Sequence, residues 1–165
     1  MRNNQAKVIA LGGVMAALAV VIMCLGGMIP LATFLCPVIV MLLERFVLIN
    51  CGKRIAWAWY MAVAILSVLM GPDKEAAAVF VFLGYYPMLK PRLDAMKLGL
   101  MVKFFLFNII VLVMYWILIR LLGMEQIARE YAEMGMVTTA VTLVLGNATF
   151  FLLDKVLGKK LRRKF

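Results

Sequence analysis

The feature that most constrains this chain is a series of long apolar runs without charge. The first runs from Val8 to Met28, 21 residues that include no Asp, Glu, Lys or Arg. At 1.5 Å per residue, a helix of this length crosses the roughly 30 Å hydrocarbon core of a bilayer. Apolar residues make up 66% of the chain, against about 45–50% in soluble domains. The sequence therefore predicts an integral membrane protein.

The remaining apolar runs indicate an all-α fold, an integral membrane bundle of six transmembrane helices in a single domain over residues 1–165. Six spans of about 20 residues use about 120 positions and leave no room for a second domain. A short amphipathic helix is expected on the outer side at about 124–134, where charged and apolar residues alternate. The predicted spans cover residues 8–28, 31–50, 56–70, 75–90, 98–122 and 137–157.

Individual residues give more local expectations. Pro37 should kink the second span, which crosses the membrane only if Glu44 and Arg45 lie at the interface. Asp73 can cap a helix that begins near residue 75. Pro91 should end the fourth span, because proline cannot donate a backbone hydrogen bond.

A cleaved signal peptide is the alternative interpretation of the N-terminus, since Arg2 and Lys7 precede the first apolar run. That run is longer than the usual 7–15-residue signal-peptide core. It also leads through Pro30 into a second apolar segment, where a secreted protein would become polar. These features favour a retained span.

Charge predicts the orientation of the chain, which carries 18 Lys and Arg against 8 Asp and Glu, a net +10. With six spans, 15 cations and 3 acids fall on one side, and 3 cations and 5 acids on the other. Lys and Arg in short loops remain cytoplasmic, so both termini are predicted in the cytoplasm. The expected location is the cell membrane, a bacterial plasma membrane. The basic tail from Lys155 should contact anionic lipids. Nucleic acid is not an expected partner.

Two amides and an outer polar cluster are the candidate substrate-binding residues. Asn108 and Asn147 lie near the middle of the last two spans, where an unpaired amide costs several kcal/mol. They predict either a shared polar site or a structural hydrogen bond between helices. Near the outer loops, cations and aromatic rings could receive a small polar ligand. These outer candidates are Arg120 and Arg129, as cationic contacts, and Tyr115 and Trp116, as stacking surfaces.

The first span also carries small residues at helical spacing, Gly12 with Ala16 and Gly13 with Ala17. Small side chains four residues apart let another helix approach closely in a membrane. This pattern predicts either a docking face for a partner subunit or packing within the chain's own bundle.

The sequence contains no recognisable catalytic motif. It has no histidine, its three cysteines are scattered singly, and it has no phosphate-binding loop or nucleophile elbow. We therefore expect neither an enzyme nor a metal protein, and no cofactor. If transport needs ATP, separate subunits must hydrolyse it.

The chain resembles the substrate-binding S components of energy-coupling factor (ECF) vitamin transporters in four features. These are the six short helices, the segment Gly12-Gly13-Val14-Met15-Ala16-Ala17-Leu18-Ala19, the loop Gly26-Gly27-Met28-Ile29-Pro30 and the basic tail. The resemblance covers nearly the whole chain. It rests on the arrangement of the helices more than on a specific sequence motif. The fourth span is shorter than in the family, and the family's Ala-x-x-x-Ala is here a glycine-alanine version.

The resemblance implies a subunit that binds a vitamin or related micronutrient in an outward-facing pocket roofed by outer loops. It implies that Gly12, Gly13, Ala16 and Ala17 contact a membrane coupling subunit, while two cytoplasmic ATPases supply the energy. The whole S component would topple to carry the ligand inward. No residue pattern names the substrate.

Two other classes remain open. One is a structural membrane protein of a cell-wall or division assembly, similar in size and helix count to the rod-shape protein MreD, with protein partners but no small ligand. The other is a membrane enzyme that acts on lipid-linked substrates, which lacks support because no catalytic pair is present.

Overall fold

The computed structural model describes residues 2–26, 32–120, 129, 132–133 and 136–158. Regular structure in this part of the chain is helical, and no strand occurs there. The described residues form two compact units, residues 2–91 and residues 92–158. Among them, four helices are long and apolar enough to cross a membrane, within Ala6–Leu25, Thr33–Cys51, Lys53–Met70 and Gly99–Arg120.

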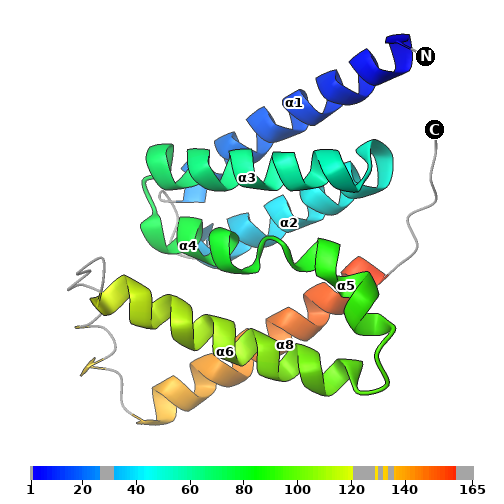
Figure 1. Cartoon of the computed structure of the whole chain (residues 1–165). Helices are drawn as coiled ribbons and strands as arrows, with labels where there is room; N and C mark the ends of the chain where they lie inside the picture. Colours follow the sequence, from blue (N-terminus) through cyan, green and yellow to red (C-terminus); the bar gives the residue numbers. More distant parts are fainter. Residues whose placement is uncertain (1, 27–31, 121–128, 130–131, 134–135, 159–165) are drawn as a thin grey trace. The chain divides into compact units, whose positions relative to one another are not determined.

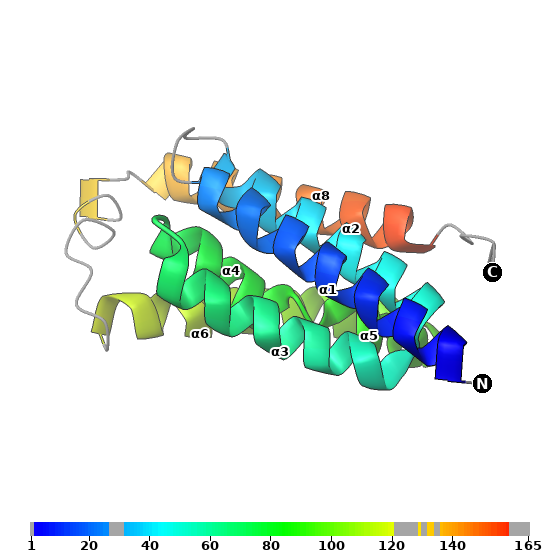
Figure 2. The same ribbon diagram turned by 90° about the horizontal axis from the view of Figure 1, so that it is seen from above.

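The first unit packs four helices against one another (Figure 1). Helix α1 contacts both α2 and α3, as the view in Figure 2 also shows, and α2 contacts α3 and α4. Their apolar sequences explain this packing, since every helix buries a stripe of Ala, Val, Met or aromatic residues. The helices are α1 (Arg2–Leu25), α2 (Ala32–Cys51), α3 (Lys53–Met70) and α4 (Lys74–Leu83).

Contacts near the helix ends fix the directions of these helices. The Cys51 thiol, at the end of α2, approaches the Val8 carbonyl near the start of α1 at 3.6 Å, so α1 and α2 are antiparallel. Cys24 and Met70, at the ends of α1 and α3, lie together, with 4.0 Å between Sγ and the carbonyl oxygen. Helices α1 and α3 therefore run the same way, as a chain crossing up, down and up requires.

Two local signals place the turns of this unit. Gly52 separates α2 from α3 with φ of +88°, a backbone conformation that side chains other than glycine rarely adopt. Asp73 caps α4, and its carboxylate accepts a hydrogen bond from the Ala76 N–H at 3.0 Å. The predicted cap is confirmed.

The segment predicted as a fourth span, residues 75–90, is divided in the structure. Helix α4 ends at Leu83, and α5 (Tyr86–Asp94) begins after Gly84 and Tyr85. The prediction that Pro91 ends the helix was wrong, because α5 continues through it to Asp94. Only the hydrogen bond to the residue 87 carbonyl is lost at Pro91, and a helix tolerates such a loss when packing supports it.

The second unit contains α6 (Gly99–Arg120) and α8 (Met136–Gly158), which pack against each other. Aromatic rings fill part of their contact, with Phe107 stacked on Phe150 at a centroid distance of 4.5 Å. The ends of α6 and α8 lie within one or two residues of the ends of the predicted spans, 98–122 and 137–157. The predicted outer helix at 124–134 and the start of the loop after α1 lie largely outside the described residues.

Glu44 lies inside the first unit, where its exposed fraction is 0%. Its expected place at the level of the membrane interface stays a prediction. Glu44 belongs to the buried stripe of α2, between Met41 and Val47, which are also buried. The helical period puts residue 44 on the same face as these apolar neighbours, so the core surrounds the carboxyl group.

Candidate functional site

The two predicted amides meet in the second unit and hydrogen-bond each other. The Asn108 Nδ2 donates to Asn147 Oδ1 at 3.0 Å, and the Asn147 Nδ2 donates to Asn108 Oδ1 at 3.1 Å. Each amide also donates to a carbonyl of its own helix, that of Phe104 at 2.8 Å or that of Leu143 at 2.9 Å. Of the two alternatives that the sequence left open, the structure shows the hydrogen bond between helices, and a shared polar site stays a prediction.

This geometry limits what the pair can still bind. A side-chain amide has two N–H donors and two acceptor lone pairs on its oxygen. Both donors of Asn108 and of Asn147 are used, while each oxygen accepts one described bond. A ligand could therefore add only as a donor to the amide oxygens, unless it opened the pair. A role of the pair in ligand binding stays a prediction.

The other predicted binding residues are spread around α6 and beyond it. Tyr115 is seven residues from Asn108, nearly the same direction around a helix, and it is half-buried. Trp116 points about 80° away from Asn108 by helical geometry and is 63% exposed. Arg120 is exposed in the last turn of α6, and Arg129 is exposed. The amide pair is the one convergence among these six residues that the described contacts establish.

The small-residue face of α1 is divided between two environments. Gly12 is buried, and a Cβ atom there would lie 3.6 Å from Ile55 Cγ2 of α3, so Gly12 serves internal packing. Gly13 is exposed, and a Cβ atom there would meet nothing within 4 Å. Ala16 is half-buried and Ala17 is exposed. Of these four small residues, Gly13 and Ala17 are the ones exposed on the outer face of the unit.

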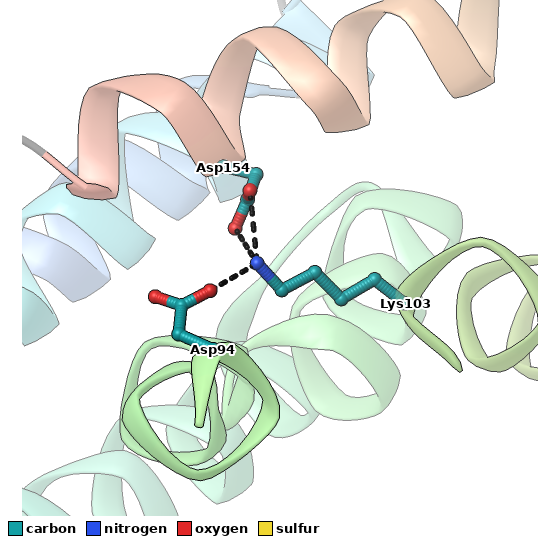
Figure 3. A network of polar contacts seen from close by, with 3 residues as sticks. All are labelled: Asp94, Lys103 and Asp154. Atoms are coloured by element: carbon teal, nitrogen blue, oxygen red, sulfur yellow. Dashed lines mark hydrogen bonds and ion pairs between the residues drawn. The ribbon is translucent and has the colours of Figure 1, made fainter. Parts of the chain in front are cut away.

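A buried ionic network in the second unit was missed by the sequence analysis (Figure 3). The Lys103 ammonium on α6 contacts Asp94 at the end of α5 and both carboxylate oxygens of Asp154 on α8, at 3.1 and 3.2 Å. The Lys103 side chain is 6% exposed, while those of Asp94 and Asp154 are 46% and 14% exposed. Three separate segments thus meet at one cation.

The charges of the network explain why Lys103 can lie inside an apolar helix. A lone buried ammonium would lose several kcal/mol of hydration, and two carboxylates offset that loss at close range. The signal in the sequence was the presence of single charges in otherwise apolar runs, at residues 103 and 154. Such charges usually face a protein partner, but the sequence could not say which one.

Comparisons with known proteins found no family model, curated protein or solved structure that matches this chain.

Proposed function

We propose that this chain is the substrate-binding membrane subunit of an ECF-type transporter that takes up a vitamin or related micronutrient across the bacterial plasma membrane. The observation that carries the proposal is the outer stripe of α1, which we define as Gly13, Val14, Ala17, Leu18 and Val21. All five are exposed on a helix apolar enough to span a membrane.

The outer stripe has the composition of a helix-docking surface. Gly13 and Ala17 let a second helix approach closely, and Val14, Leu18 and Val21 supply dispersion contacts around them. Because Gly12 packs inside the unit, the proposed contacts with the partner helix are made by Gly13 and Ala17. A membrane coupling subunit is the proposed occupant, and two cytoplasmic ATPases bound to that subunit would supply energy.

The substrate would enter from the outer side, where the sequence has five of its eight acids and few cations. The proposed contacts are the amide oxygens of Asn108 and Asn147, the rings of Tyr115 and Trp116, and the cations Arg120 and Arg129. Four candidate membrane spans and the sorting of Lys and Arg support a multi-pass membrane subunit.

Copurification with the coupling subunit from the same cells tests the proposal. Gly13→Leu should abolish the association, because its side chain would occupy the space of the partner helix. It should leave the folded chain intact, since nothing lies within 4 Å of a Cβ at residue 13. Val68→Leu, at an exposed position of α3 outside the outer stripe, is the control and should still assemble.

Ligand binding provides the second test, by thermal shift of the detergent-purified chain against a panel of vitamins. A stabilising ligand is expected, by mass action on the folded state. Normal assembly of Gly13→Leu together with no shift by any vitamin would refute the transport role and favour a scaffold of the MreD kind.

A further inference from the structure

The four-helix unit encloses a carboxyl group that the proposed transport function does not use. Glu44 is 0% exposed, and neither of its side-chain oxygens has a hydrogen-bond partner. Its neighbours one turn away on α2, Val40, Met41 and Val47, are apolar and buried. An ionised carboxylate without a partner in such surroundings costs many kcal/mol.

Helix α3 brings polar groups to the same region, while its two cations, Lys53 and Arg54, are exposed in its first turn, next to the end of α2. The Tyr60 side chain interacts electrostatically with Glu44. Its hydroxyl already donates to the Val81 carbonyl on α4, so it is not available to the carboxylate as a donor. The adjacent Trp59 has a buried indole N–H that also lacks a partner.

The charged groups of the other helices that pack on α2 lie at its two ends. On α1, Lys7 precedes Val8, which contacts Cys51, seven residues or about 10 Å along α2 from Glu44. At the start of α4, Asp73 interacts with Cys36, eight residues or about 12 Å away in the other direction. Among the described residues of these helices, Tyr60 is therefore the titratable group for which an electrostatic interaction with Glu44 is established.

We propose that Glu44 is a proton-binding site within the membrane-spanning unit, occupied by one proton as a neutral carboxylic acid while the four helices are packed. A proton neutralises the carboxylate without further ligands. A metal cation would need several oxygen ligands, and the described residues contain no cluster of three or more His, Cys, Asp or Glu that could hold one. The inference is independent of the transport proposal.

Reaction with a membrane-permeant carbodiimide, dicyclohexylcarbodiimide, tests the site on the full chain in detergent. The O–H of a carboxylic acid adds across a C=N bond of the reagent, and rearrangement gives a stable N-acylurea that retains the whole reagent mass. Peptide mass mapping should locate the adduct at Glu44, with a rate that falls as pH rises. Glu44→Gln should remove the adduct, and Glu75→Gln, a half-exposed acid on α4, should not.

Infrared spectroscopy keeps the test decisive if the reagent fails to enter. The wild-type minus Glu44→Gln difference spectrum at neutral pH should contain the C=O stretch of a protonated carboxyl group, shifted in D₂O. A carboxylate band in its place would overturn the proposal. Protection of Glu44 from the reagent by Na⁺ at constant pH would also overturn it, in favour of a cation site.

Stability provides an independent readout because Glu44→Gln preserves shape and neutrality. A native state that holds the proton binds more protons than the unfolded state, so its stability decreases as pH rises. The melting temperature of the wild type should fall with pH relative to that of Glu44→Gln. Parallel pH profiles for the two proteins would contradict the proposal.

Discussion

Replacing Lys103 by Met should strongly destabilise the second unit. The substitution keeps most of the side-chain volume but removes the ammonium that Asp94 and Asp154 both contact. Two carboxylates then remain where a cation held them together. Their mutual repulsion and the lost contacts act in the same direction, against the packing of α6 on α8 and the contact with Asp94.

The magnitude follows from the exposures of the three side chains. A charge pair at about 3 Å attracts by about 5 kcal/mol at an effective dielectric constant of about 20, and much of this offsets desolvation. Removing one partner of a buried pair costs about 3–5 kcal/mol. Asp94 is 46% exposed and can hydrate, whereas Asp154 is 14% exposed. We expect the low end of that range, about 3 kcal/mol.

Reversible unfolding in mixed detergent micelles, followed by circular dichroism, measures the free energy of unfolding for each variant. The double variant Lys103→Met/Asp154→Leu should recover most of the loss, because an apolar pair can replace a buried ion pair at little cost. Asp94→Asn should cost less than Asp154→Asn, since Asp94 is more exposed. A Lys103→Met variant as stable as the wild type would refute the electrostatic account of this network.

Two further changes test the remaining contacts. Asp73→Ala should lower the free energy of unfolding by about 1 kcal/mol through loss of the cap on α4. Asp73→Asn keeps an acceptor oxygen and should lower it less. Equal losses for the two variants would contradict the capping role of Asp73. Asn108→Leu should cost about 1–2 kcal/mol, because Asn147 loses both the hydrogen bond that it donates and the one that its oxygen accepts. Asn108→Leu/Asn147→Leu should regain stability in the same micelle assay, and additive losses would show that the two amides do not act as a pair.

Much of the helical plan could be predicted from the sequence. Long apolar runs with few or no charges placed α1, α2, α3, α6 and α8, because hydrocarbon tolerates few charged side chains over a helix of this length. The Asp73 cap was predictable because it depends on residues three positions apart. The amide pair was predictable in part, since two polar groups in apolar runs each need a partner.

Local rules were least successful around α4 and α5. The length and hydropathy of residues 75–90 predicted a single span, whereas in the structure α4 ends before Gly84 and α5 begins after Tyr85. Proline rules ended the helix at Pro91, although α5 continues to Asp94. Both outcomes depend on packing with other helices, which can outweigh the preference of a single residue.

The sequence by itself determined that this is a helical chain with membrane-spanning character, because hydropathy and length act on each segment separately. Only the tertiary structure decided how neighbouring residues divide their roles. Gly12 packs inward while Gly13 faces outward, and Glu44 lies in the core although Arg45 follows it. A helix turns by 100° per residue, so adjacent side chains enter different environments, and the arrangement of the other helices sets which one each meets.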